Sequence, residues 1–260
     1  MYKEEKKYLK INASEVSACI GDNKYLSKEV MVLKLWKRIY EESFKEAIKR
    51  NNINLININD IKTNNNVNKK YIKNYKRTIT NRENGLNNES KIIDIYQSMK
   101  KISIKDNNKK SYSIFINKSY NKLLYYTVLI SGFIDGIVEE LNDKYIVEIK
   151  DRQNKLFEKI PEHELIQVII YMKMTNIYQC HHIERYKEEL KTEIIKFDNK
   201  KWDTIEKKII EFVDYFEKIY FNNIFQDLFL KKILKSIKIK NELSSNMGIV
   251  LELNESINIK

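Results

Sequence analysis

The sequence is poor in cysteine, proline and glycine. Its 260 residues include two cysteines, one proline and five glycines. Cys19 and Cys180 are too few for a disulfide framework, a four-cysteine metal site or a four-cysteine iron–sulfur site, and they indicate a reducing compartment. The scarcity of glycine and proline predicts that helices and strands dominate over turns.

A long hydrophobic run is also missing. Five of the first eight residues are charged, so they contain no apolar core of a signal peptide, and no stretch of about 18 apolar residues occurs later. We therefore expect a soluble, intracellular protein with no membrane partner.

Acidic residues are outnumbered by basic ones. Lysine and arginine total 48 against 36 aspartates and glutamates, a net charge of +12. Two explanations stay open. A polyanion such as nucleic acid is attracted by this charge. Alternatively, an AT-rich genome raises lysine, asparagine and isoleucine together, and the sequence is rich in all three.

The length allows one large domain with an appended helical region. We expect the domain over residues 1–200, with the Asn/Lys-rich residues 51–84 as an insert or loose loop. Residues 201–260 are expected to form a C-terminal helical extension packed on or following the core. Its apolar stripe has the spacing of a helix that buries one face: Trp202, Ile205, Ile209, Phe212, Phe216 and Ile219.

Periodicity predicts the remaining elements. Helices are expected over residues 14–20, from Ser27 onward with a buried stripe, over residues 85–99 and over residues 163–175. Ser14 would cap or begin the first helix. Strands are expected near residues 111–116, 123–130 and 178–186, giving a mixed α/β fold with a sheet of at least four strands.

Residues 130–150 predict a β-hairpin. Two apolar, β-branched runs, residues 132–141 and 145–150, flank the turn-forming pair Asn142-Asp143. A two-residue loop would place Leu141 opposite Lys144, and counting back would pair Asp135 with Lys150.

One face of this hairpin concentrates charge. Because side chains alternate between faces, Asp135, Glu148 and Lys150 share one face, while Ile134, Val147 and Ile149 form an apolar face that would pack on a helix. Hard cations such as Mg²⁺ take carboxylate oxygens, and a nearby lysine can orient a metal-bound water or balance phosphate charge. The alternative is a sheet face that carries only a salt bridge.

Two further polar positions, Glu89 and Gln167, have two interpretations each. Glu89, in the first turn of the helix expected from Gly85, is either a metal ligand or an acidic residue favoured by the helix dipole. Gln167 interrupts an apolar helix and either ties it to a strand or faces the metal site. The adjacent His181 and His182 would point to opposite faces of a strand, which makes them a poor zinc pair.

Taken in order, these motifs resemble the YqaJ and lambda-exonuclease family of viral recombination nucleases, within the PD-(D/E)xK superfamily. The opening Ile-Asn-Ala-Ser-Glu of residues 11–15 with Ile20-Gly21 is similar to the family's "ITASE…ILG". Gly85 with Glu89 looks like its "G…E" helix. The other matches are Asp135-Gly136 to "xxDG", Glu148-Ile-Lys150 to "ExK", and residues 167–175 to "QVQxxMxVT".

The resemblance implies a restriction-endonuclease-like three-layer core, a mixed sheet flanked by helices. It also implies Mg²⁺- or Mn²⁺-dependent hydrolysis of DNA phosphodiesters, 5′ to 3′ on duplex ends, in recombination or repair. By this resemblance Asp135 and Glu148 are metal ligands, with Glu89 as an additional ligand. Lys150 would activate water and Gln167 would position Lys150.

Contacts with substrate phosphate fall to Ser14, Arg152 and Lys155, although solvated loop charge is the other account of Arg152 and Lys155. The expected partners are duplex DNA ends, further copies of the chain and a single-strand annealing protein. A viral source would place the protein in the cytoplasm or nucleus of a host.

The sequence also departs from the family. Asp151-Arg152-Gln153 follows Lys150 where the family commonly has Cys-Pro, and the Asn-rich segment is absent from compact members. The alternative function is a nuclease-fold protein that binds nucleic acid without cutting it.

Overall fold

The computed structural model describes residues 9–61, 66–105, 110–117, 127–140 and 143–253. The chain forms two compact units. The first comprises Met1–Ser17 and Glu83–Lys208, and the second comprises Ala18–Arg82 and Ile209–Lys260. Both units are therefore built from segments far apart in the sequence. A separate domain over residues 1–200 stays a prediction.

The first unit contains a five-stranded sheet in the order β3-β6-β7-β8-β9 and a three-stranded sheet in the order β1-β5-β4. The larger sheet comprises β3 (Ile104–Lys105), β6 (Gly136–Glu139), β7 (Lys144–Asp151), β8 (Gln179–Tyr186) and β9 (Glu189–Lys196). The smaller comprises β1 (Leu9–Asn12), β4 (Ser111–Asn117) and β5 (Thr127–Phe133). β7 and β8 are parallel neighbours joined through α5 (Glu162–Thr175), whereas β6–β7 and β8–β9 are antiparallel. The sheet is therefore mixed.

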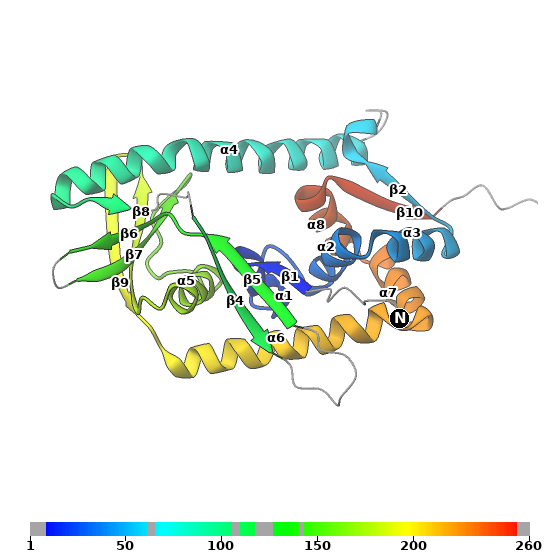
Figure 1. Ribbon diagram of the computed structural model, residues 1–260. Helices are drawn as coiled ribbons and strands as arrows, with labels where there is room; N and C mark the ends of the chain where they lie inside the picture. Colours follow the sequence, from blue (N-terminus) through cyan, green and yellow to red (C-terminus); the bar gives the residue numbers. More distant parts are fainter. Residues whose placement is uncertain (1–8, 62–65, 106–109, 118–126, 141–142, 254–260) are drawn as a thin grey trace, which may run out of the picture. The chain divides into compact units, whose positions relative to one another are not determined.

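Helices cover the two faces of the five-stranded sheet (Figure 1). On one face, α4 (Asn66–Lys100) packs Ile92, Ile93 and Tyr96 against apolar residues of β6, β7 and β8. On the other face, α5 carries Glu164, which contacts His182 of β8. The α/β class is confirmed, and the arrangement of helix, mixed sheet and helix is consistent with a restriction-endonuclease-like core.

The hairpin forms, but its predicted register is wrong by two residues. Gly136 pairs with Val147 and Glu139 with Lys144, and the backbone N–H of Glu140 donates to the Asp143 carbonyl at 2.8 Å. This register matches apolar with apolar residues and sets an ion pair of 3.0 Å between Glu139 and Lys144 at the end of the ladder. A shift of two residues preserves the faces, and it brings Asp135 level with Glu148 instead of Lys150.

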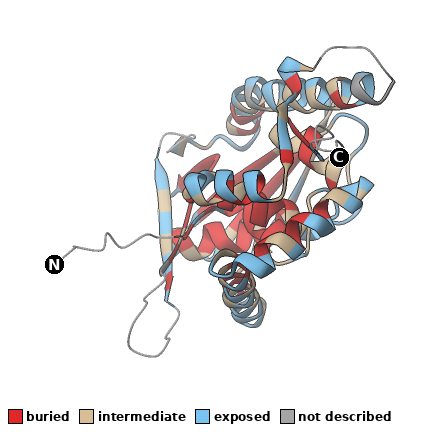
Figure 2. Ribbon diagram, turned by 90° about the vertical axis from the view of Figure 1, so that its right-hand side faces the viewer, coloured by how far each residue is buried: buried red, intermediate tan, exposed pale blue. Residues whose placement is uncertain are grey.

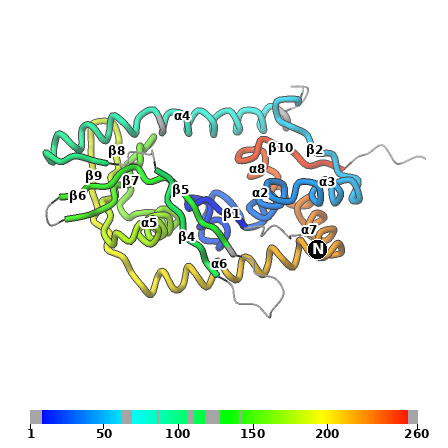
Figure 3. The backbone as a smooth tube through the Cα atoms, in the orientation of Figure 1, coloured from blue at the N-terminus to red at the C-terminus, as the bar shows by residue number. Residues whose placement is uncertain are grey.

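The chain changes sheets immediately before β6. β5 belongs to the three-stranded sheet and β6 to the five-stranded sheet, and Ile134 and Asp135 form the connection (Figure 3). The next residue, Gly136, has to be a glycine because Ile104 of β3 packs directly against its backbone. A Cβ at Gly136 would lie 2.1 Å from Ile104 Cγ2. The Asp-Gly pair therefore marks a bend and a close strand approach.

Residues 51–84 are not a loose loop where the structure describes them. They contain β2 (Ile53–Asn57), the short helix η2 (Ile58–Asp60) and the first half of α4. Residues 62–65 lie outside the described residues. Tyr71 packs with Ile58 and Val250, together with the partly buried Ile72 and Tyr75. This packing stabilises a helix whose many asparagines have low intrinsic helix propensity.

Glu89 consequently lies in the interior of α4, so the expectation of a first-turn position was wrong. Ile92, Ile93 and Tyr96 of the same helix are buried, whereas Met99 is exposed. Ser14 lies in the short helix η1 (Ala13–Glu15) and does not cap it. Asn12 holds the N-cap position, and its backbone N–H donates to the Glu15 carboxylate at 3.1 Å.

Other predicted elements are present. β4 and β8 lie where strands were expected, α5 begins after Pro161, and the helix near residues 14–20 is reduced to η1 and the short α1 (Val16–Cys19), with Gly21 at positive φ after it. β5 covers the end of the strand expected over residues 123–130, whose first part lies outside the described residues. No helix among the described residues is long and apolar enough to cross a membrane.

The second unit is mainly helical. Its elements are α2 (Lys28–Ile39), α3 (Glu41–Arg50), β2, η2, α7 (Asn223–Lys235), α8 (Ile237–Met247) and β10 (Ile249–Leu253), with residues of α4 and α6 (Asn199–Tyr220). The predicted stripes on the helix from Ser27 and on α6 are buried, although Tyr40 divides the first into α2 and α3. Buried residues lie on the inward faces of these helices and exposed residues on the outer faces (Figure 2).

Candidate active site

The first unit brings two carboxylates together at the bend between its sheets. Asp135 lies two residues after the end of β5, and one oxygen of its carboxylate accepts a 2.7 Å hydrogen bond from the backbone N–H of Ile149. Glu148, on β7, lies level with Asp135 in the hairpin register. Both are largely buried, with 7% of Asp135 and 2% of Glu148 exposed. The hydrogen bond fixes Asp135 beside the strand that carries Glu148.

Only one of the two carboxylate oxygens of Glu148 is hydrogen-bonded within the described part of the chain. Its Oε1 accepts from Lys150 Nζ at 2.5 Å, whereas its buried Oε2 has no hydrogen-bond partner among the described residues. Burial, with the negative charge of Asp135, raises the pKa of Glu148 to about 8 although Lys150 opposes the shift. Two close carboxylates with one unpaired buried oxygen are the environment that a divalent cation stabilises.

Lys150 remains a cation in this environment. Although burial alone would lower it, the charges of Glu148 and Asp135 raise the pKa of Lys150. Its side chain is 24% exposed, compared with 2% for that of Glu148, so part of the lysine side chain reaches the surface while Glu148 stays buried.

The residues present fit Mg²⁺ or Mn²⁺. Asp135 and Glu148 supply hard oxygen donors, and Mg²⁺ usually binds one or two protein carboxylates together with waters and substrate phosphate. The unpaired Oε2 of Glu148 is a donor for such an ion. The identity of the metal stays a prediction.

A tyrosine that the sequence analysis missed lies beside the carboxylates. Burial, with the nearby charge of Glu148, raises the pKa of Tyr171, and Asp135 and Lys150 also act on it. Gln167, one helical turn earlier on α5, donates its amide to the Tyr171 hydroxyl at 2.7 Å. Gln167 therefore reaches the site through Tyr171. The four-residue spacing of the two residues was the available signal, but a tyrosine on an apolar helix is typical of a core position.

A glycine makes room for this tyrosine. A Cβ at Gly132 of β5 would lie 3.0 Å from Tyr171 Cε1 and 3.2 Å from the Cβ of Ala13. The ring of Tyr171 thus packs against the backbone of β5, three residues before Asp135. The approach of α5 to β5 depends on the missing side chain at position 132.

Glu89 lies one turn before Ile92 and Ile93 on α4, the helix that covers the apolar face of β7. Its neighbour Asn88 donates to the Asp151 carboxylate at 2.7 Å, which ties α4 to the end of β7. Glu148 is on the opposite face of β7 from that apolar cluster. The assignment of Glu89 as an additional ligand stays a prediction.

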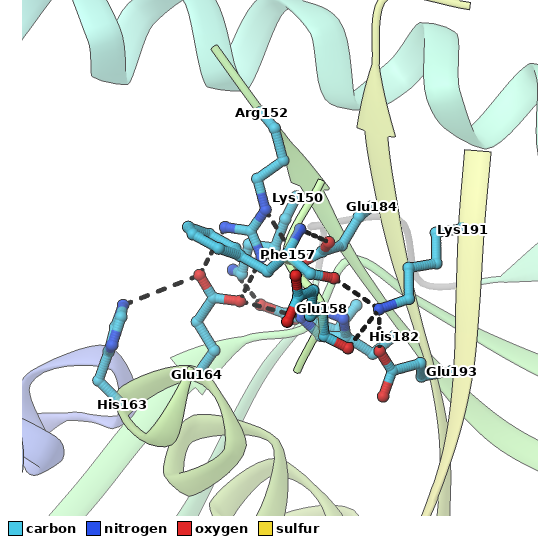
Figure 4. Close-up of polar contacts among 11 residues, drawn as sticks. Lys150, Arg152, Phe157, Glu158, His163, Glu164, His182, Glu184, Lys191 and Glu193 are labelled. Atoms are coloured by element: carbon cyan, nitrogen blue, oxygen red, sulfur yellow. Dashed lines mark hydrogen bonds and ion pairs between the residues drawn. The ribbon is translucent and has the colours of Figure 1, made fainter. Parts of the chain in front are cut away.

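Arg152 is held by two buried carboxylates (Figure 4). Its Nη1 and Nη2 each donate to Glu164 at 2.6 Å, Nε donates to Glu184 at 3.0 Å, and Nη2 also contacts Glu184 Oε1. A phosphate would have to compete with both carboxylates for this guanidinium. Ser14 and Lys155 are exposed, and the phosphate role of all three residues stays a prediction.

The two histidines point to opposite faces of β8, as predicted. His181 stacks on Tyr145, with ring centroids 3.8 Å apart, and its Nδ1 lies 2.8 Å from the Tyr96 hydroxyl. His182 is buried, and its Nε2 lies 3.1 Å from Glu164 Oε2. Ligand atoms of Glu164, His182 and Glu184 lie within 4.8 Å of one another, as in a metal site, but Arg152 already supplies a cation to both carboxylates.

Together these features define an α/β protein with a buried pair of carboxylates and a lysine at the bend between two sheets. Solved structures with a similar fold include the protein SSO0001, 13% identical, covering 83% of this chain and 79% of that one with a TM-score of 0.46. An alkaline exonuclease from Laribacter hongkongensis is 12% identical, with coverage of 87% and 93% and a TM-score of 0.44.

A phage-related exonuclease from Haemophilus somnus 129PT is 15% identical, with coverage of 82% and 95% and a TM-score of 0.42. No family model matches the sequence, and no curated protein matches it either. Similarity of this degree does not assign an activity, so the proposal below depends on the site itself.

Proposed function

We propose that this protein is a metal-dependent exonuclease that hydrolyses DNA phosphodiester bonds. The observation that carries the proposal is the buried Oε2 of Glu148 beside Asp135, which has no hydrogen-bond partner among the described residues, with Lys150 on the other oxygen. A structural salt bridge would satisfy the charge of one carboxylate with one lysine. Here the charges of two carboxylates act on one ammonium, and the remaining negative charge fits a divalent cation.

Each residue has a separate task in this reaction. Asp135 and Glu148 hold the cation, which when bound polarises the scissile phosphate and lowers the pKa of a water molecule. Lys150 places its ammonium where a water or a phosphate oxygen can approach, and it balances negative charge that accumulates on the phosphate. Gln167 holds the Tyr171 hydroxyl by a hydrogen bond, and Tyr171 lies within reach of the charges of Glu148, Asp135 and Lys150.

The substrate and polarity follow from the resemblance of the motifs to recombination exonucleases. We expect 5′ to 3′ digestion of duplex ends in recombination or repair, with Glu89 as an additional ligand and Ser14 and Lys155 near substrate phosphate. Because Glu164 and Glu184 already hold the Arg152 guanidinium, we propose no phosphate contact for Arg152. A homo-oligomer and a single-strand annealing protein remain the expected partners.

The test is digestion of end-labelled linear duplex DNA with Mg²⁺, Mn²⁺ or EDTA. Glu148→Ala and Lys150→Ala should each reduce the rate at least about a hundredfold, as expected for groups that act on the reacting phosphate. The hairpin provides matched controls. Glu139 and Lys144 form an exposed ion pair at its other end, and Glu139→Ala and Lys144→Ala should retain the wild-type rate. The position of the label that is released first reveals the polarity.

The second candidate is a nuclease-fold protein that binds nucleic acid without cutting it. The net charge of +12 favours it, because basic residues bind phosphates without sequence preference. If wild-type protein binds DNA in a salt-dependent manner but leaves it intact with every metal, this second function replaces the first. Equal loss of activity in the Glu139 and Lys144 controls would also remove the assignment of the site.

A further inference from the structure

Arg152 joins three elements of the first unit. It follows β7 directly, and its guanidinium contacts Glu184 of β8 and Glu164 in the first turn of α5 (Figure 4). The backbone of β7 and β8 is also joined there, since the Arg152 N–H donates to the Arg185 carbonyl at 2.7 Å. We call Arg152, Glu164, Glu184 and His182 the arginine cluster.

The arginine cluster also fixes the segment between β7 and α5. Glu184 Oε2 accepts from the backbone N–H of Phe157 at 2.9 Å, and the guanidinium lies 4.4 Å from the Phe157 ring centroid. Lys191 of β9 donates to the carbonyls of Phe157 and Glu158 at 2.6 and 3.0 Å. The path from the strand with Glu148 and Lys150 to the helix with Gln167 and Tyr171 is thus held at several points.

The contacts are those of a rigid ion pair. Glu164 and Glu184 are buried, and the side chain of Arg152 is 11% exposed. Both oxygens of Glu164 accept from the guanidinium, a bidentate geometry that restricts orientation as well as distance. A lysine could replace the charge but not the fork of parallel hydrogen bonds.

We propose that Arg152 is a positioning residue that sets where Gln167 and Tyr171 lie relative to Glu148 and Lys150. The inference rests on the proposed nuclease function and extends it to a residue outside the reacting groups. Glu164 lies three residues before Gln167 on α5, which is less than one helical turn. The hydrogen bonds from Arg152 to Glu164 therefore also constrain the position of Gln167. Gln167 then holds the Tyr171 hydroxyl beside the carboxylates.

Hydrogen exchange tests the structural half of the proposal without requiring catalysis. In Arg152→Lys, the amides of the first turns of α5 should exchange at least about tenfold faster than in wild type, because the bidentate grip on Glu164 is lost. Arg50→Lys is the matched control. Arg50 donates to Asp227 and Gln226 in the second unit, so its replacement should leave exchange in α5 unchanged.

Kinetics test the catalytic half. Arg152→Lys should lower kcat for DNA digestion at least about tenfold while KM and the affinity for Mn²⁺ stay within about twofold, because the DNA contacts and the carboxylates are intact. Tyr171→Phe removes the hydroxyl that α5 presents. If Arg152 acts through this hydroxyl, Tyr171→Phe should lower kcat less in the Arg152→Lys background than in the Arg50→Lys background.

Three results would overturn the proposal: an unchanged kcat in Arg152→Lys, additive effects of Arg152→Lys and Tyr171→Phe, or unchanged exchange in α5. Should Arg152→Lys fail to fold, Glu164→Gln retains the shape of the side chain and weakens the same grip, and it must give the same pattern. Wild-type protein that does not cut DNA would refute the nuclease function, and with it the catalytic half. The exchange result would still decide whether Arg152 positions α5.

Discussion

Glu148 is the residue at which burial and charge conflict most directly. The hairpin buries it beside Asp135, and Lys150 opposes the resulting rise of its pKa. A carboxylate in this position costs stability when ionised without a cation. The protein therefore keeps a polar group in an unfavourable state that the proposed metal ion would relieve, as is usual for a functional site that reduces fold stability.

This conflict predicts a dependence of stability on pH. The pKa of Glu148 is raised from 4.5 to about 8 in the folded chain, so its contribution to stability is complete below the unfolded pKa and is lost as the pH rises toward about 8. The loss is at most roughly 1.4 kcal/mol for each pH unit. Metal-free wild-type protein should therefore lose more stability than Glu148→Gln between about pH 5 and pH 8.

Thermal melts in EDTA and in Mg²⁺ measure this effect. Mg²⁺ should raise the melting temperature of wild type by more at about pH 8 than at about pH 6, because it binds the ionised carboxylates of the folded chain. The same addition should leave Glu148→Gln nearly unchanged. A larger effect of Mg²⁺ at the lower pH would contradict the raised pKa of Glu148.

At the scale of elements, α4 shows what pattern and propensity can each predict. Its second half was expected, because Ile92, Ile93 and Tyr96 recur at helical spacing without many asparagines between them. The first half has a stripe as well, with Tyr71 and Tyr75 at a four-residue spacing. Frequent asparagine and threonine made that helical pattern hard to recognise in the sequence. The stripe packs against Val250 of β10, which lies far along the chain. Tertiary packing overrides weak local preference here.

A substitution in that stripe tests the packing. Tyr71 is buried against Ile58 and Val250, and Tyr71→Ala should lower the free energy of unfolding by about 3 kcal/mol, the cost of removing a large buried ring. Urea unfolding measures the difference. Tyr25 is more than half exposed, so Tyr25→Ala is the matched control and should cost less than about 0.5 kcal/mol. Equal losses would show that Tyr71 is not packed.

The candidate site was predictable in part for similar reasons. The alternation of side chains along the hairpin correctly placed Asp135 and Glu148 on one face. An error of an even number of residues in the register leaves every side chain on the same face. The register itself was wrong, because Asn142-Asp143 was taken as the whole loop. The position of Tyr171 beside the carboxylates and the contacts of Arg152 were not predicted. They join α5 to β7 and β8, and no local period reports contacts between elements.

At the scale of the whole molecule, each unit needs both halves of the chain. In the second unit, β10 completes a two-stranded sheet with β2, and Arg50 of α3 pairs with Asp227 of α7 at 2.8 Å. Tyr40 stacks on Tyr220 with centroids 4.0 Å apart. A division of the chain at residue 200 would separate all of these partners.

A chain that ends at Lys200 therefore should not unfold cooperatively, because β2, α3 and the first half of α4 lose the surfaces that bury them. Circular dichroism during heating measures this. A chain that ends at Leu253 retains β10 and should melt as the full chain does. A cooperative melt of the shorter chain would instead establish an independent domain over residues 1–200.

The interleaving of the units also has a consequence for synthesis on the ribosome. β1 pairs with β5, and Ile53 of β2 pairs with Leu253 of β10. At 5–20 residues per second, β2 waits roughly 10–40 s for its partner to be made. The nascent chain thus exposes an unpaired strand edge and apolar helix faces for most of its translation. Its yield in a cell should depend on chaperones and on elongation rate more than the stability of the finished fold would suggest.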